Sequence, residues 1–315
     1  MSDKKKYNYN KDLRLFSFLN PPVILPLLPA MQFFMKGFYL TDFTDKALTK
    51  KKINIPLRDG GSIRALVYSP VCTAEKDMPC IIFYHGGGFV YNAAPHHFTL
   101  AKNLAKALGA KVIFPDYRLA PKHPFPAAVN DAFDTYLYVR ENSAKLGINV
   151  NKIALCGDSA GGNLSAVTCL VAKEKGIPQP LAQMLLYPFV DSDATTPSMV
   201  EFTNTPMCNS KAAVKYNKAY IPEGTSEKPE WFSAVDAPDH SELAEAYIET
   251  AEFDCLRDGG VKYYNRLTQA GTKAELLETK GTMHGYDIAT KSETYFLCMK
   301  KRTEFLKRVF SEINL

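Results

Sequence analysis

The chain has 315 residues, of which 46% are apolar and 23% charged, so it can bury a sizeable core in one large α/β domain or two small ones. Its formal net charge of +5 is small, and the short clusters Lys4–Lys6 and Lys50–Lys52 accompany no nucleic-acid-binding pattern. Nucleic acid is therefore excluded as a partner.

Cysteine and histidine spacing excludes two further classes. The seven cysteines are dispersed without C-x-x-C spacing, which argues against a disulfide framework and for a reducing compartment. His96 and His97 are adjacent and have no second pair nearby, so we expect no metal site. We predict a cytoplasmic protein.

The first segment of interest, Leu15–Met35, contains no charged residue and follows several lysines, as a signal anchor would. Its four prolines, Pro21, Pro22, Pro26 and Pro29, would interrupt a membrane-spanning helix repeatedly, and no small-x-small cleavage site follows. We predict instead two short apolar helices that lie over the body of the protein. Contact with lipid without spanning it is the alternative.

After this segment, strand patterns and helix patterns alternate. Asp59-Gly60 is typical of a hairpin turn between the first two strands, and continuous apolar runs follow, as expected of strands buried on both faces. This alternation predicts a mainly parallel sheet with helices on both faces and an antiparallel exception at the first two strands. The predicted strands are Ile53–Leu57, Ile63–Ser69, Cys80–Tyr84, Lys111–Phe114, Ile153–Cys156, Ala182–Tyr187, Ala246–Thr250 and Ala274–Glu278, and the predicted helices include Phe98–Leu108, Asn130–Asn142 and Glu293–Ile313.

Residues 190–230 interrupt the alternation with acidic residues, paired threonines and several prolines around one helical pattern at Ser210–Ala219. The segment is too long for a plain connection, so we interpret it as an insertion. We expect it to form a cap together with residues 1–48, over a catalytic domain of residues 49–315.

A G-x-S-x-G pentad at Gly157–Gly161 lies between an apolar strand pattern and a helical pattern. A serine on so sharp a turn projects its hydroxyl away from the sheet, and larger residues two positions before or after it would collide with neighbouring backbone. Ser159 is therefore a candidate nucleophile. The backbone N–H of Ala160 lies at the start of the helix, where unpaired donors can bind an anion.

A catalytic serine needs a base and a carboxylate that orients the base. His284 follows the last predicted strand and Asp254 follows the strand before it, so both lie at the sheet edge where open α/β sheets bind ligands. The order Ser159, Asp254, His284 is the order of an α/β-hydrolase.

Other residues compete for these two roles. His123 and Asp258 are the main alternatives, and Glu252 is a weaker one. Chain order and strand-end placement favour Asp254 and His284. We interpret Asp258 as a structural acid that pairs with a neighbour such as Arg257 or with a helix terminus.

Three consecutive glycines in His85–Phe89 directly follow the predicted strand Cys80–Tyr84. They leave backbone N–H groups uncovered and let the main chain approach a substrate closely. We predict that Gly86 and Gly87, with Ala160, donate to an oxyanion, and that His85 supports the loop.

Together these motifs resemble the hormone-sensitive-lipase-like (bacterial family IV) esterases. The motifs are His85–Gly88, Asp116–Pro121, Phe125–Ala128, Gly157–Gly162, Asp254–Asp258 and His284–Tyr286. The resemblance covers about residues 80–290 and implies an eight-stranded α/β-hydrolase fold with a cap. It also implies carboxylic ester hydrolysis without a cofactor, by a triad of Ser159, Asp254 and His284.

We accordingly expect a serine carboxylesterase that hydrolyses short-acyl, small-molecule esters through an acyl-enzyme. The candidate pocket walls are Phe89, Tyr187, Phe189, Phe202 and Tyr286, although aromatic residues are as often core. Two alternatives stay open: a membrane-associated lipid or amide hydrolase, suggested by the apolar N-terminus, and a non-catalytic small-molecule-binding protein on the same fold. The sequence also leaves homodimer formation open.

Overall fold

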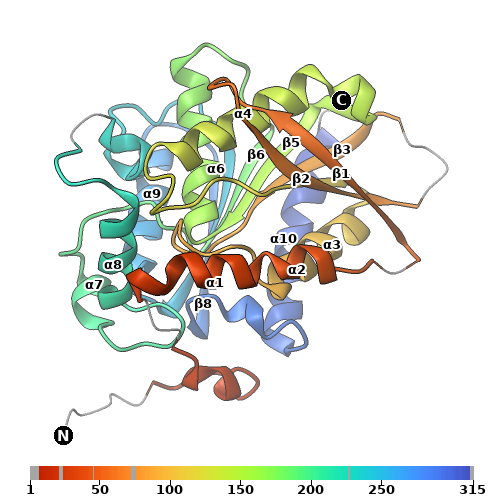
Figure 1. Ribbon diagram of the computed structural model, residues 1–315. Coiled ribbons are helices and arrows are strands. Elements are labelled where there is room, and N and C mark those ends of the chain that lie inside the picture. Colours follow the sequence, from red (N-terminus) through yellow and green to blue (C-terminus); the bar gives the residue numbers. More distant parts are fainter. Residues whose placement is uncertain (1–6, 21–23, 45, 72–75, 226–227, 313–315) are drawn as a thin grey trace, which may run out of the picture.

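The computed structural model describes residues 7–20, 24–44, 46–71, 76–225 and 228–312, and within them eight strands form one sheet in the order β1-β2-β4-β3-β5-β6-β7-β8 (Figure 1). β2 pairs antiparallel with β1 and β4, and the other neighbouring pairs are parallel. The α/β-hydrolase fold predicted from the sequence is confirmed. The strands are β1 Leu48–Pro56, β2 Ser62–Pro70, β3 Met78–Tyr84, β4 Lys111–Pro115, β5 Ile148–Asp158, β6 Ala182–Leu186, β7 Glu245–Phe253 and β8 Ala274–Met283.

Helices cover both faces of the sheet because its central strands are apolar on both sides; Ile81, Ile82 and Phe83 of β3 are all fully buried. One hydrophobic core includes residues of α4, α6 and α9, and the other includes residues of α3 and α10. Figure 1 shows these two layers. The helices beside the sheet are α3 Pro95–Leu108, α4 Ala127–Glu141, α5 Ser143–Leu146, α6 Ala160–Glu174, α9 Arg257–Gln269 and α10 Glu293–Glu312.

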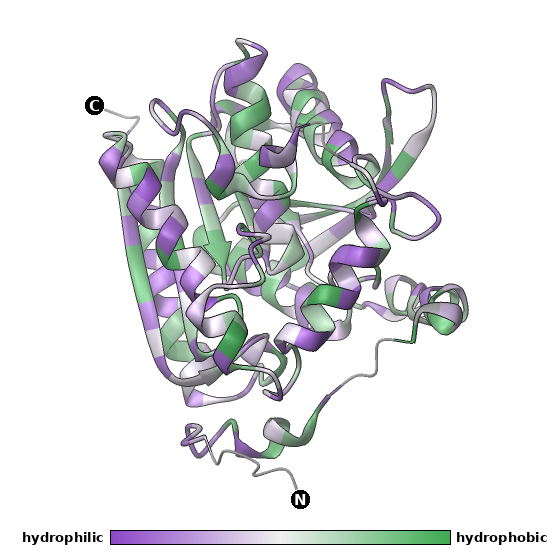
Figure 2. Ribbon diagram, turned by 90° about the vertical axis from the view of Figure 1, so that its left-hand side faces the viewer, coloured by the Kyte–Doolittle hydropathy of each residue, from purple (hydrophilic) through white to green (hydrophobic). Residues whose placement is uncertain are grey.

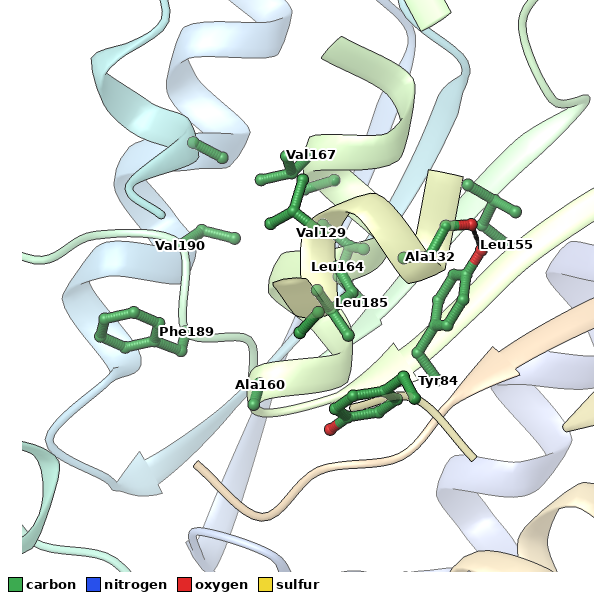
Figure 3. Packing of buried hydrophobic residues seen from close by; sticks show 14 of the residues in the cluster. Tyr84, Val129, Ala132, Leu155, Ala160, Leu164, Val167, Leu185, Phe189 and Val190 are labelled. Carbon is green, nitrogen blue, oxygen red and sulfur yellow. Dashed lines mark hydrogen bonds between the residues drawn. The ribbon is translucent and has the colours of Figure 1, made fainter. Parts of the chain in front are cut away.

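Helix α6, which begins directly after Ser159, is embedded in the first of these cores. Leu164 of α6, Val129 of α4 and Leu185 of β6 lie close together in Figure 3. Tyr84 at the end of β3 donates a hydrogen bond from its hydroxyl to the carbonyl of Ala132 in α4, at 2.8 Å. Fully burying one leucine side chain contributes about 1.5–3 kcal/mol, so this packing holds the start of α6 in place.

The N-terminal segment forms short helices on the outside of the molecule: η1 Arg14–Phe18, η2 Leu25–Leu27, α1 Leu28–Met35 and α2 Gly37–Thr41. Figure 1 shows α1 and α2 crossing the front of the molecule and η1 below the body. The ring of Tyr39 in α2 packs against Phe98 of α3, with the centroids 5.0 Å apart. Within the described residues, no helix has the length and apolar character needed to cross a bilayer.

Residues 190–230 contain α7 Pro197–Glu201 and α8 Ser210–Tyr220, and are followed by the short helix η4 Ala234–Asp236; η3 Pro229–Trp231 spans the boundary. The amide of Met207, just before α8, donates to the carbonyl of Leu19 in the N-terminal segment at 2.7 Å. The two segments that the sequence assigns to a cap therefore touch each other. Some residues named in the sequence analysis lie outside the described part of the chain: Lys4–Lys6, Pro21, Pro22, Cys72 and Ile313.

Candidate active site

Ser159 lies on the turn between β5 and α6 with a backbone conformation of φ 52° and ψ −116°. Non-glycine residues rarely adopt positive φ, and such strain persists only where the surroundings enforce it. Here the Ser159 amide donates to the carbonyl of Leu186 in β6 at 2.9 Å. A Cβ on Gly157 would collide with Gly161, and one on Gly161 would collide with the carbonyl of Tyr84. The two glycines therefore permit the close packing that the turn requires.

The structure brings Ser159, His284 and Asp254 together from the ends of β5, β8 and β7. His284 Nε2 lies 2.9 Å from the Oγ of Ser159, and His284 Nδ1 lies 2.7 Å from Asp254 Oδ2. All three side chains are buried, Asp254 completely. This arrangement suits transfer of the serine proton to the imidazole while the carboxylate holds the ring.

The electrostatic surroundings favour a basic imidazole at His284. Burial disfavours its charged form, but the carboxylate of Asp254 outweighs this effect and raises the pKa of His284 to about 9. The second oxygen of Asp254 accepts the amide of Leu256 at 2.9 Å, which fixes the carboxylate. His284 is thus a stronger proton acceptor than a solvent-exposed histidine.

The glycine loop after β3 corrects one prediction. The amide of Gly86 donates to Oδ1 of Asp158 at 2.9 Å, so it is directed at a carboxylate and not at a free oxyanion position. The amides of Gly87 and Gly88 make no hydrogen bond to any described residue. The amide of Ala160, the first residue of α6, has no intrahelical partner. Gly87, Gly88 and Ala160 are therefore the available donors, and sequence reasoning missed Gly88.

His85 supports this loop, since its ring stacks on that of Tyr117 at 4.4 Å between centroids. Its backbone carbonyl accepts the hydroxyl of Tyr117 at 2.7 Å. Burial and the neighbouring His97 lower the pKa of His85 to about 3, so its ring is neutral. His97 Nε2 in turn lies 3.2 Å from Asp158 Oδ2. Asp158 thereby links the glycine loop to α3, a role that the pentad and the His96-His97 pair did not reveal.

Comparison with known proteins identifies the family. The sequence pattern of the α/β hydrolase fold matches residues 81–288. The chain belongs to this family. Esterase LipI of Mycobacterium tuberculosis is 33% identical over 281 residues, covering 84% of this chain and 87% of that protein. Carboxylesterase NlhH of the same organism is 36% identical over 223 residues, 70% of each chain.

Solved structures agree with this assignment. The structure of a bacterial heroin esterase matches with a TM-score of 0.87 at 30% identity, over 96% of this chain and 98% of that one. An esterase of Pyrobaculum calidifontis matches with a TM-score of 0.80 at 33% identity, over 89% and 92% of the two chains. The chain is a hormone-sensitive-lipase-like member of the α/β-hydrolases, as the sequence motifs suggested.

In this α/β-hydrolase a small cavity of about 20 Å³ lies beside the serine. Phe89 and Phe189, both predicted pocket residues, are on its wall. The other lining residues are Gly88, Ser159, Ala160, Cys208, Ala213, Tyr216, Asn217 and Leu256. Three of them, Ala213, Tyr216 and Asn217, come from α8, within residues 190–230. A Cβ on Gly88 would lie 2.5 Å from the Cγ of Tyr216.

The other three predicted pocket residues do not line this cavity. Tyr187 packs edge-on against the ring of His284, with centroids 5.1 Å apart, and Tyr286 packs against Tyr187. Phe202 packs against Phe253 and beneath the guanidinium of Arg257. All three rings are buried and pack against other side chains instead of the cavity.

The alternative candidates for the catalytic acid and base, Asp258, Glu252 and His123, make contacts outside the triad. Asp258 accepts the amide of Ser198 at 2.7 Å and pairs with the adjacent Arg257 at 2.9 Å, the structural role expected of it. Glu252 accepts the amide of Gly281 at 2.7 Å. His123 lies in the loop before α4, and within the described residues no hydrogen bond joins it to the serine.

A buried ionic cluster lies behind the loop that carries His284, and sequence reasoning did not find it. Arg302 of α10 is completely buried and contacts Glu249 at 2.5 Å and Asp287 at 2.9 Å. Asp287 also accepts the hydroxyl of Tyr187 at 2.8 Å. A buried charge must be paired, so the cluster ties α10 to the segment immediately after His284.

Proposed function

We propose that this α/β-hydrolase is a serine carboxylesterase that hydrolyses small-molecule esters through an acyl-enzyme, with Ser159, His284 and Asp254 as its triad. The observation that supports this most strongly is the hydrogen-bonded line from Asp254 through His284 to Ser159, with distances of 2.7 Å and 2.9 Å. The names of its relatives, esterase and carboxylesterase, agree with that chemistry.

In the first half of the reaction, His284 Nε2 accepts the proton of Ser159 as the serine Oγ attacks the ester carbonyl. Asp254 keeps the Nδ1–H of His284 in place and stabilises the imidazolium that forms. Amides of Gly87, Gly88 and Ala160 are available to the developing oxyanion, where one such donor is worth about 10²–10³ in turnover.

Collapse of this first tetrahedral intermediate breaks the ester C–O bond; His284 gives its proton to the departing alcohol, and the acyl group stays on Ser159. Water then enters, gives its proton to His284 and attacks the acyl carbonyl. Collapse of this second intermediate returns the proton to Ser159 and releases the carboxylic acid. No group beyond these side chains and amides takes part in the cycle as proposed.

The acyl group in this proposal is short. The cavity beside Ser159 has a volume of about 20 Å³, which is space for about one water molecule. We assign its closure to the cap, made of residues 1–48 and 190–230, with Tyr216 of α8 over the glycine loop. A long acyl chain would have to displace α8, so affinity and turnover should fall with chain length.

The assignment of Ser159 is tested by Ser159→Ala. Turnover of p-nitrophenyl butyrate should fall by about 10⁶-fold, because removing the nucleophile of a triad abolishes acyl transfer. The wild type should also be labelled by a fluorophosphonate, whereas the variant should not. Near-normal turnover by the variant, or a wild type that resists labelling, would contradict the proposal.

The acyl preference is tested separately with p-nitrophenyl acetate, butyrate, octanoate and laurate. We expect kcat/KM to fall beyond butyrate in the wild type and to fall much less in Tyr216→Ala. Val214→Ala is the matched control, since Val214 lies on the same helix with half of its side chain exposed. A preference for laurate in the wild type would refute the short-acyl assignment but leave the triad standing.

A further inference from the structure

Large exposed apolar side chains are concentrated in the N-terminal segment. Of thirteen such side chains in the described residues, eight fall within residues 15–43. These eight are Leu15, Phe18, Leu19, Ile24, Leu27, Phe33, Phe34 and Phe43. Phe33 and Phe34 of α1 are 83% and 74% exposed. Figure 2 shows the short helices of this segment, with apolar residues in green, at the outer edge of the molecule. Exposed apolar side chains concentrated in one segment are typical of an interaction surface.

A groove with cationic lining residues lies beside this surface. It has a volume of about 520 Å³ and runs between α1, α2 and the adjoining strands β1 and β2. Phe33 and Phe34 form part of its wall, and Lys36 and Lys52 form another part; Arg64 also lines the groove and is ion-paired there with Asp116 at 3.1 Å. Lys36 and Lys52 are exposed to solvent. Apolar and positively charged groups therefore meet at one place.

Counted by segment, the charge of the chain is uneven. Residues 1–52 contain ten Lys and Arg against four Asp and Glu, a formal charge of +6. Because the whole chain carries +5, the other 263 residues sum to −1. The apolar surface thus lies within a segment of the sequence that carries a net positive charge, most of it from lysines on either side of residues 15–43.

We propose that residues 15–20 and 24–43, with the adjoining groove, dock the protein onto a bilayer surface that carries anionic lipid. Apolar side chains enter the boundary between headgroups and acyl chains, while nearby lysines attract lipid phosphates. α1 has eight residues and is about 12 Å long, so it lies on the surface and does not span it. A second copy fits less well, since a two-fold interface would bring the same basic groups together.

The docking surface is connected to the site through direct hydrogen bonds. The side chain of Gln32 in α1 donates to the carbonyls of Val90 and Ala120, both at 2.8 Å, and Val90 follows the glycine loop. The carbonyl of Leu19 accepts the amide of Met207, next to Cys208 on the cavity wall. Docking therefore positions the cap against the lipid surface, from which apolar esters can enter.

Vesicle flotation with the full-length chain tests the proposal. We expect binding to vesicles of phosphatidylcholine with 30% phosphatidylglycerol, at least tenfold weaker binding to phosphatidylcholine alone, and weaker binding at high salt. Phe33→Ser/Phe34→Ser should weaken binding at least tenfold. Lys36→Gln/Lys52→Gln should weaken it about 30-fold, at roughly fivefold per lysine.

Matched changes on α10 provide the control. Phe296 and Leu297 are also exposed, at 58% and 59%, and Phe296→Ser/Leu297→Ser should bind like the wild type. All variants should hydrolyse p-nitrophenyl butyrate normally and keep their melting temperature, which separates lost docking from lost folding. Failure of the wild type to bind anionic vesicles overturns the proposal, as does equal loss of binding in the α10 control. A dimer that Phe33→Ser/Phe34→Ser dissociates would assign the surface to a second copy instead.

Discussion

The strand-end edge around Ser159 and the N-terminal segment satisfy opposite physical requirements. Around the site, the charged groups Asp254 and Arg302 are buried and paired, Asp254 with His284 and Arg302 with Glu249. In the N-terminal segment, phenylalanines are exposed and lysines face solvent. Buried charges are stable only where each is paired with an opposite charge. An exposed apolar surface, in contrast, lowers its free energy when a partner removes it from water. One region is therefore built for fixed geometry and the other for contact.

The largest effect on turnover is expected from a change in the proposed catalytic triad. Asp254→Asn should lower kcat by about 10⁴-fold with little change in KM, because asparagine would favour the wrong tautomer of His284. Steady-state kinetics with p-nitrophenyl butyrate measure this. Asp258→Asn, at the start of α9 and outside the hydrogen-bonded line, should change kcat far less. Equal losses in both variants would place the essential carboxylate elsewhere.

The buried cluster should dominate stability in the same region. Arg302→Met leaves the carboxylates of Glu249 and Asp287 buried without their cation, so the free energy of unfolding should fall by about 3–5 kcal/mol. Urea unfolding followed by circular dichroism measures the loss. Arg308→Met removes a partly exposed ion-paired arginine of the same helix and should cost about 1 kcal/mol or less. A loss no larger for Arg302→Met than for Arg308→Met would contradict the role of the cluster.

Loss of the contact between Asp158 and the glycine loop should lower the turnover number. Asp158→Ala releases the amide of Gly86 and the ring of His97, and we expect kcat to fall about 10²-fold as the oxyanion donors lose their positions. Asp158→Asn keeps a carbonyl oxygen as an acceptor for Gly86 and should recover part of the loss. If both variants were equally impaired, the charge of Asp158 and not its contact with Gly86 would matter.

The pKa of His284 predicts the pH profile. Its pKa is raised from 6.5 to about 9, so the ring stays protonated to higher pH than a free histidine. Only the neutral ring can accept the serine proton, and kcat/KM should therefore rise with pH through this range. Rates between pH 5 and 10, corrected for spontaneous ester hydrolysis, measure the acid limb. A limb at or below pH 6.5 would show that Asp254 does not raise the pKa.

The smallest effect is expected in the N-terminal segment. Phe33→Ser removes an exposed ring and should change the free energy of unfolding by no more than about 0.5 kcal/mol. Phe83→Ala, at a fully buried ring in β3, should cost about 3–5 kcal/mol. Thermal unfolding of both variants provides the measurement. A large loss for Phe33→Ser would mean that this surface is packed within the protein and is not available to a partner.

Most of the fold could be predicted from the sequence, since buried strands and amphipathic helices leave local patterns. The predicted helices Phe98–Leu108 and Asn130–Asn142 correspond to α3 and α4 with boundaries shifted by up to three residues. The prediction Ile153–Cys156 found only the centre of β5, which runs from Ile148 to Asp158, because its first half is polar and partly exposed. The assignment of residues 1–48 and 190–230 to a cap stays a prediction.

The sequence by itself determined which groups are present and in what order: a serine on a glycine-flanked turn, then an acid and a histidine at later strand ends. These features depend on short stretches of chain, where spacing alone restricts the backbone. Tertiary structure decided which of these groups face one another. It directed the amide of Gly86 to Asp158, buried Arg302 behind the histidine loop and placed Tyr216, not Tyr286, on the cavity wall. Such contacts join residues far apart in the sequence, 72 positions for Gly86 and Asp158, and no local pattern encodes them because they arise only when separate elements pack together.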